Sequence, residues 1–78
     1  MKEILETMIK NLVEDEASVS IEEIAQDSEI KFEVRVNEKD MGRVIGREGR
    51  VANAIRTLVQ ANSSLHDNKY VKIDIDKF

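Results

Sequence analysis

All three glycines of the 78-residue chain fall within eight positions, at Gly42, Gly46 and Gly49, and the chain contains no proline. Glycine accepts a positive φ and allows another backbone to approach closely. Residues 42–49 are therefore the segment best suited to an unusual backbone path. Elsewhere the chain has to rely on regular helices, strands and ordinary turns, so the sequence predicts a small ordered domain with one special loop.

Size and composition limit the classes of protein to consider. The length suits a single domain over residues 1–78, and a hydrophobic content of 41% is enough for a folded core. Without cysteine there is no disulfide framework and no thiolate site, and we expect no metal or other cofactor. Residues 1–6 mix charged and apolar side chains, unlike a signal peptide, and no stretch approaches the roughly 20 apolar residues of a membrane span. We therefore expect a cytoplasmic protein.

The first half of the chain predicts a helix followed by a hairpin. Apolar residues spaced by three and four predict an amphipathic helix over residues 1–13, frayed at the acidic run 14–16, because acids at a helix C-terminus oppose its dipole. A short strand is predicted over about 18–25, although Glu22 and Glu23 interrupt its alternation. Strict alternation predicts a half-buried strand over 30–37, with residues 26–29 as the turn.

The second half predicts two helices and a last strand. We expect Asp40 to cap a short helix that holds three apolar residues, Met41, Val44 and Ile45. A longer apolar period predicts a helix from Val51 to about residues 62–64, a loop over 66–69, and a strand over 71–76. The order α-β-β-α-α-β predicts an α+β domain with a three-stranded sheet and helices packed on one face.

Charge is distributed unevenly between the two halves. Residues 1–40 carry five basic and twelve acidic side chains, for a net charge of −7, whereas residues 41–78 carry seven basic and four acidic ones, for +3, which together give the net −4. An acidic chain is a poor sequence-blind binder of nucleic acid, because phosphate repels it at long range. A local basic patch nevertheless surrounds the glycine loop, with Glu48 as its only acid: Arg43, Arg47, Arg50 and Arg56.

The glycine loop has two interpretations from its residues alone. Gly46 could simply end one helix and Gly49 ease the turn into the next. Alternatively, loop amides and a helix N-terminus could cradle a phosphate, with arginine forks donating paired hydrogen bonds. A P-loop is excluded because no Gly-Lys pair exists, and the spacing G-x-x-x-G-x-x-G does not match a dinucleotide fingerprint.

The segment Val44–Ile55, with its V-I-G-R-E-G run, resembles the helix–GxxG–helix signature of KH domains, whose loop clamps about four nucleotides of a single strand. The order of elements extends the resemblance to nearly the whole chain, as a type II KH domain. The chain is similar to small free-standing bacterial KH proteins. This resemblance implies a non-catalytic, cytoplasmic RNA-binding protein that acts as an RNA chaperone.

The resemblance also implies which residues contact RNA. Gly46 and Gly49 would let the loop approach phosphates, and Arg47 would contact them. Ile45, with Val44 or Gly42, would wall an apolar groove for bases. The complete implied set is Gly42, Arg43, Val44, Ile45, Gly46, Arg47, Glu48, Gly49, Arg50, Asn53 and Lys69. Glu48 departs from the basic or neutral residue usual there, so we expect modest affinity.

The partners implied by the resemblance are single-stranded RNA, a second copy of the chain, and a larger multidomain KH protein of the KhpB (Jag/EloR) type. The implied role is post-transcriptional control of cell elongation and peptidoglycan homeostasis. The net negative charge favours an alternative, a dimerising KH adaptor in which protein–protein docking is the main role and RNA contact is secondary.

Nothing in the sequence indicates an enzyme. His66 is the only histidine, and its polar surroundings favour a solvated side chain over a catalyst or metal ligand. No pairing of a nucleophile with a base is visible, so we expect neither catalysis nor a bound metal.

Overall fold

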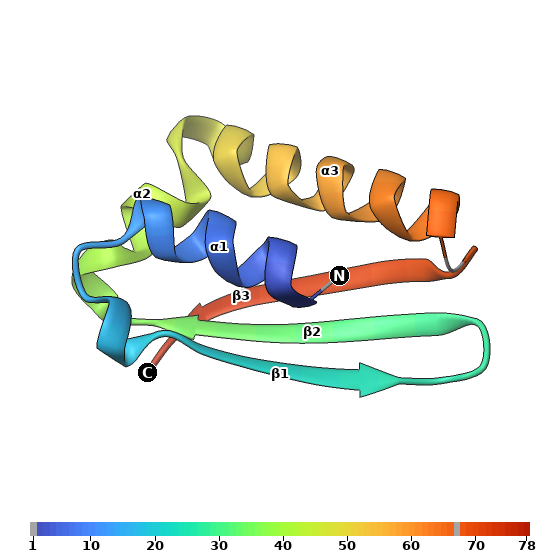
Figure 1. Ribbon diagram of the computed structural model, residues 1–78. Helices are drawn as coiled ribbons and strands as arrows, with labels where there is room; N and C mark the ends of the chain where they lie inside the picture. The colour runs from blue at the N-terminus through green and yellow to red at the C-terminus, as the bar shows by residue number, and fades with distance from the viewer. Residues whose placement is uncertain (1, 67) are drawn as a thin grey trace.

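The computed structural model describes residues 2–66 and 68–78, and it has the predicted order of helices and strands (Figure 1). Single turns of 3₁₀ helix precede β1, α2 and α3, at Glu16–Ser18, Glu38–Asp40 and Arg47–Gly49. The main elements are α1 (Lys2–Leu12), β1 (Ser20–Ala25), β2 (Glu29–Val36), α2 (Met41–Ile45), α3 (Arg50–His66) and β3 (Tyr70–Lys77). The α+β fold class is therefore confirmed.

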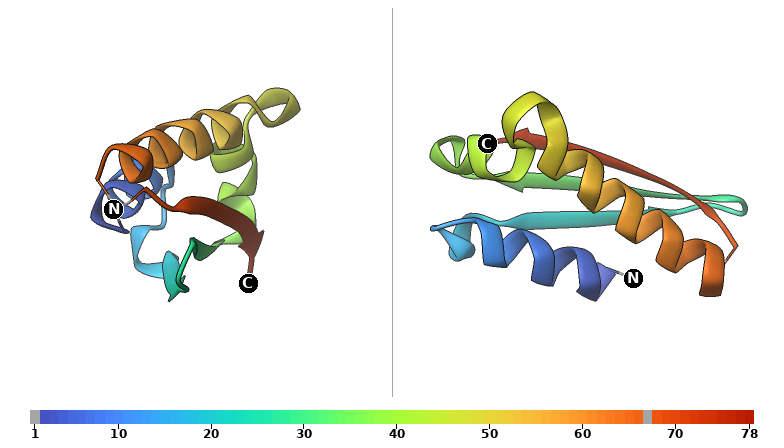
Figure 2. Two further views of the ribbon diagram at one scale, coloured as in Figure 1. Left: turned by 90° about the vertical axis from the view of Figure 1, so that its right-hand side faces the viewer. Right: turned by 90° about the horizontal axis from the view of Figure 1, so that it is seen from above.

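The three strands form a mixed sheet in the order β1-β2-β3. β1 is antiparallel to β2, with Ser20 opposite Arg35, and β3 is parallel to β2, with Ile30 opposite Val71. Parallel neighbours need a long crossover, which α2, the glycine loop and α3 provide. All three helices cover one face of the sheet, as predicted, and leave the other face open (Figures 1 and 2).

The core lies between the helices and the covered face of the sheet. The alternation predicted for β2 is confirmed, since its four even-numbered residues, Ile30, Phe32, Val34 and Val36, are all buried. Leu5 and Ile9 of α1 and Ile55 and Val59 of α3 pack into the same cluster. Burial of these apolar side chains is the main favourable term in the stability of the fold.

Two predicted boundaries differ from the structure by two residues or more, and the others lie within one residue. β1 begins at Ser20 rather than at residue 18, because the chain first makes a 3₁₀ turn. α3 continues to His66 instead of ending at residues 62–64, so His66 belongs to a helix and not to a loop. Ser63, predicted to end the helix, instead lies within α3, and its buried hydroxyl donates to the carbonyl oxygen of Lys69 at 2.8 Å.

Asp40 occupies the predicted position before α2, but its side chain does not cap that helix. The carboxylate is fully buried and accepts hydrogen bonds from the backbone amides of Glu14 and Asp15, at 3.1 and 3.2 Å. The chain immediately after α1 is therefore fixed to the start of α2. From the sequence alone, only fraying of the first helix at residues 14–16 is predicted.

Polar side chains of α3 cover the outer edge of β3. Gln60 accepts from the amide of Val71 at 2.8 Å and donates to the carbonyl oxygen of Lys69 at 3.0 Å. Arg56 donates from Nε to the carbonyl oxygen of Ile73 at 3.2 Å. These bonds satisfy backbone groups that an open sheet edge would expose, and they fix α3 relative to the sheet.

Candidate nucleic-acid interface

The loop between α2 and α3 has an unusual backbone. Gly46, Glu48 and Gly49 have φ values of 75°, 57° and 76°, all in the left-handed region. The amide of Gly46 ends α2 by donating to the carbonyl oxygen of Gly42 at 2.9 Å, and Gly49 donates to Gly46 at 3.2 Å. The resulting tight reversal protrudes from the helical layer (Figure 2). The special path predicted for this glycine cluster is therefore present.

Two arginines beside this loop present their charge to solvent. Arg47 makes no ion pair or side-chain hydrogen bond within the part of the chain that the structure describes. The side chain of Arg50 is 79% exposed, and its Nη2 lies 3.9 Å from a carboxylate oxygen of Glu48. The N-terminus of the 17-residue helix α3 adds a partial positive charge at the same place. The loop is thus a locally positive surface on an acidic protein.

Arg43, by contrast, is engaged within the protein. Its Nη2 lies 2.6 Å from Oε1 of Glu14, and its Nε lies 3.6 Å from Oδ1 of Asp40. These contacts direct the guanidinium toward the end of α1. Its predicted contact with RNA stays a prediction, and it would compete with these ion pairs.

The predicted apolar wall is only partly available. Val44 is fully buried in the core, so, contrary to the prediction, its side chain has no surface to offer a base. Ile45 is half-buried and Gly42 is exposed. If bases pack beside α2, they would have to do so against these two residues.

Arg56, which is not in the predicted set, lies beside two of its members on α3. Its Nη1 donates to Oδ1 of the exposed Asn53 at 3.3 Å, while its Nε is held by the edge of β3. The signal was present in the sequence, because Arg50, Asn53 and Arg56 recur every three residues and so share a side of one helix.

Lys69 lies at the opposite end of α3 from the loop, a distance of about 25 Å for a helix of 17 residues. A shallow hollow runs between α3 and the start of β3, along the intervening part of the helix. It is lined by Arg56, Thr57, Gln60, Ala61, Tyr70 and Val71. The structure therefore does not bring Lys69 to the loop, but this hollow extends from Arg56 toward it.

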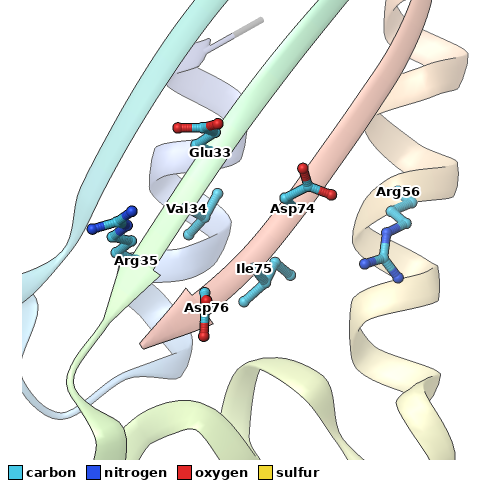
Figure 3. A pocket seen from close by; sticks show the side chains of 7 residues that line it. All are labelled: Glu33, Val34, Arg35, Arg56, Asp74, Ile75 and Asp76. Atoms are coloured by element: carbon cyan, nitrogen blue, oxygen red, sulfur yellow. The ribbon is translucent and has the colours of Figure 1, made fainter. Parts of the chain in front are cut away.

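A second hollow, which reaches from β2 and β3 to Arg56 of α3 at the edge of the sheet, is unsuited to phosphate. Figure 3 shows the charged side chains of β2 and β3 with Arg56 facing them from α3. Three carboxylates outnumber two guanidiniums in its lining: Glu33, Asp74, Asp76, Arg35 and Arg56. Lys31 lies 3.4 Å from Glu33 and 3.5 Å from Asp74, and the pKa of Lys31 is raised, first by its hydrogen bond to Glu33. The positive charge of Lys31 is therefore already compensated by carboxylates of the sheet.

Metal-binding and membrane-spanning features are absent from the described part of the chain. Residues 2–66 and 68–78 contain no cluster of three or more His, Cys, Asp or Glu side chains able to hold a metal ion. None of the helices formed by these residues combines the length and the apolar character needed to cross a membrane.

Comparison with known proteins places this geometry in a family. The family model described as "KhpA/KhpB, KH domain" matches residues 2–75. The protein named "RNA-binding protein KhpA" of Clostridium perfringens is 41% identical over 75 residues, which cover 96% of this chain and 99% of that protein. Its namesake in Listeria monocytogenes is 40% identical, with 96% and 97% coverage.

A solved structure shares the fold. The crystal structure of a point variant of Aquifex aeolicus Era, bound to GDP.AlF4-, superposes with a TM-score of 0.76 at 18% identity, covering 97% of this chain but 30% of the longer one. This likeness shows the fold alone. The relatives are named for RNA binding and not for catalysis, which agrees with the expectation that the protein is not an enzyme. From the family model and these relatives, the chain belongs to the KhpA/KhpB family of KH domains.

Proposed function

We propose that this protein is a cytoplasmic, non-catalytic RNA-binding protein that grips short single-stranded RNA with the loop Gly46–Gly49. The observation that carries the proposal is the exposure of Arg47 and Arg50 beside a glycine-built reversal, on a chain of net charge −4. The name of its relatives, "RNA-binding protein KhpA", supports the same function.

The chemistry of the grip would be electrostatic and local. The backbone amides of Arg47 and Glu48 can donate to phosphate oxygens, because the flanking glycines leave no Cβ in the way, whereas the amides of Gly46 and Gly49 already donate within the protein. Arg47 and Arg50 would add charge-assisted hydrogen bonds, and Asn53 would reach the backbone from the next turn of α3. Glu48 opposes this binding, so affinity should be modest and salt-sensitive.

We propose that the strand continues from the loop along the hollow between α3 and β3. Arg56 borders the loop end of this path, and Lys69 lies at its far end. Bases would pack against Gly42 and Ile45 beside the loop and against the exposed ring of Tyr70 farther along. With three aromatic residues in the chain, stacking can contribute at few positions.

The cellular role is proposed from the family. We propose an RNA chaperone that pairs with a KhpB (Jag/EloR)-like protein in post-transcriptional control of cell elongation and peptidoglycan homeostasis. The support is the family description itself, which joins KhpA and KhpB domains in one model.

A second function, docking to a second copy of the chain, is favoured by an apolar stripe on α3. Leu58 is 58% exposed and Leu65 is 82% exposed. With two exposed alanines they repeat at intervals of four, three and four, as Ala54, Leu58, Ala61 and Leu65. If two such helices pack antiparallel, each leucine lies opposite an alanine, which is the self-complementary arrangement that a two-fold interface needs. We call these four residues the α3 stripe.

Crosslinking of bound RNA tests the first function against the second. The Arg47→Asp/Glu48→Asp variant should lose RNA crosslinking while its circular dichroism stays native. Arg35→Asp makes the same change in net charge on the open face of the sheet, and it should crosslink like the wild type. If the loop variant crosslinks as well as the wild type, the loop is not the RNA-binding site.

A further inference from the structure

Helix α2 is too short to be stable without contacts to the rest of the protein. It has five residues, Met41–Ile45, and isolated helices of that length are not stable in water. Its place must come from contacts with the rest of the protein. Burial of Val44 in the core is one such contact, and it fixes how deep the helix lies rather than the direction in which it points.

The buried carboxylate of Asp40 supplies a second contact, at the N-terminal end of α2. Each of its two oxygens accepts one backbone amide from the chain that leaves α1, from Glu14 at 3.1 Å and from Asp15 at 3.2 Å. Its exposed fraction is 0%. A carboxylate is buried this completely only when hydrogen bonds compensate for the lost water. The two bonds therefore hold residues 14–15 and the start of α2 in one arrangement.

Two further side chains reinforce this connection. Arg43 bridges the carboxylates of Glu14 and Asp40 from the first turn of α2. Asn37 donates from Nδ2 to Oδ2 of Asp15 at 3.2 Å, while its Oδ1 accepts from the amide of Lys39 at 3.1 Å. We call Glu14, Asp15, Asn37, Asp40 and Arg43 the polar latch.

We propose that Asp40 is a positioning residue for the RNA-binding loop, acting through α2. Gly46 follows Asp40 by six positions, which is about 9 Å of helical rise. A small rotation of α2 about its buried Val44 would therefore displace the start of the loop. This inference rests on the proposed RNA-binding function, and it assigns to Asp40 a contribution to affinity without any contact with RNA.

The test compares Asp40→Asn with the wild type in two measurements. Asparagine keeps the volume but turns an amide group toward one of the two backbone donors, so one bond of the latch is lost. Without RNA, the amide resonances of residues 46–49 should shift and their hydrogen exchange should accelerate. Affinity for a randomised single-stranded RNA should fall about tenfold, at a temperature where the variant is fully folded.

Ile30→Val or Ile30→Ala, whichever matches the loss of thermal stability, is the control. Ile30 is buried beside the hairpin turn and is not part of the latch. The control should keep wild-type loop resonances and wild-type RNA affinity. If the loop amides of Asp40→Asn do not move, or if they move while affinity stays at the wild-type value, Asp40 does not position the loop for RNA.

The absence of RNA binding can be distinguished from the absence of a positioning role for Asp40. If the wild type binds no RNA, the RNA-binding proposal fails, and the loop amides of the free protein alone decide whether Asp40 fixes the loop. If Asp40→Asn does not fold, Asn37→Ala replaces it, because it removes the bond to Asp15 without leaving a buried charge unpaired. The loop amide resonances and the RNA affinity are then measured in the same way, and both should change less than expected for Asp40→Asn.

Discussion

A Cβ atom on Gly46 would lie 2.9 Å from both the backbone nitrogen and the Cβ of Val51. Real Cβ atoms do not approach other atoms so closely, and Gly46 also has a φ of 75°. The loop is therefore closed against the first turn of α3. Glycine is needed at this position for two independent reasons, space and backbone conformation.

The three glycines should respond differently to alanine. Gly46→Ala should lower the free energy of unfolding by about 2–4 kcal/mol, from overpacking and left-handed strain together. Gly49→Ala meets Asn53 only at 3.9 Å, so strain alone should cost about 1–2 kcal/mol. Gly42 has open space and lies within α2, so Gly42→Ala should stabilise the protein by about 0.5–1 kcal/mol. Urea unfolding of the three variants measures this order, and a Gly46→Ala variant as stable as Gly42→Ala would contradict it.

The sequence indicates where the backbone takes an unusual path, because glycine adopts positive φ at little cost. Glu48 could not be assigned such a backbone, yet its φ is 57°. Glu48 lies between Gly46, which has no room for a Cβ against Val51, and Gly49. Glycine positions therefore located the special turn, but they did not indicate that the residue between them shares its left-handed backbone.

Neutralising Glu48 should strengthen RNA binding. Glu48→Gln keeps the side-chain shape and the strained backbone, so stability should change by less than about 0.5 kcal/mol. Removal of the negative charge beside bound phosphate should raise affinity about three- to fivefold at low salt, with a smaller gain at high salt. Fluorescence anisotropy with single-stranded RNA measures both values.

Glu22→Gln is the matched control, because it removes one negative charge from β1, on the open side of the sheet opposite Glu33. Its affinity should stay close to that of the wild type. Equal gains in the two variants would show that net charge, and not the place of Glu48 in the loop, limits binding.

Stability should depend on pH through Asp15. Its pKa is lowered from the ordinary value of 3.8, because the hydroxyl of Ser18, at 2.6 Å, and then the amide of Asn37 donate to the ionised carboxylate. A lowered folded-state pKa means that this stabilisation is present above pH 3.8 and is lost as the pH falls through the folded value. Asp15→Asn should therefore melt at a lower temperature than the wild type near neutral pH.

The difference in melting temperature between Asp15→Asn and the wild type should shrink as the pH is lowered from about 7 to about 3. Thermal unfolding followed by circular dichroism at a series of pH values measures it. A difference that stays constant across this range would show that the carboxylate charge contributes nothing to the stability of the fold.

Self-association should depend on the α3 stripe. Leu58→Asp places a charge in the middle of the stripe, and because the side chain is already 58% exposed, the fold should tolerate it. In sedimentation velocity the wild type should form a concentration-dependent dimer and the variant should remain a monomer. Ile24→Asp, on the exposed strand β1, is the control and should still dimerise. A wild type that stays monomeric at every concentration contradicts the antiparallel pairing.

The candidate site was only partly predictable. The arginines around the loop and the apolar face of α3 follow from spacing in the sequence. The burial of Val44 and the ion pairs of Arg43 do not, because both depend on contacts with α1 and the sheet that are distant in the chain. Asp40 is the clearest case. Its position before a helix predicted a local cap, but its carboxylate bonds to amides 25 and 26 residues away.

RNA binding by the loop is tested most directly by a nuclear magnetic resonance titration of the ¹⁵N-labelled protein with short single-stranded RNA. If the loop binds RNA, the amide resonances of Gly46–Gly49, of Arg50 and of Asn53 should move first and most, with smaller shifts along the hollow toward Lys69. Resonances of β1 on the open face of the sheet, such as those of Glu22 and Ile24, should stay in place. Shifts confined to the sheet, or no shifts at any RNA concentration, would contradict RNA binding by this loop.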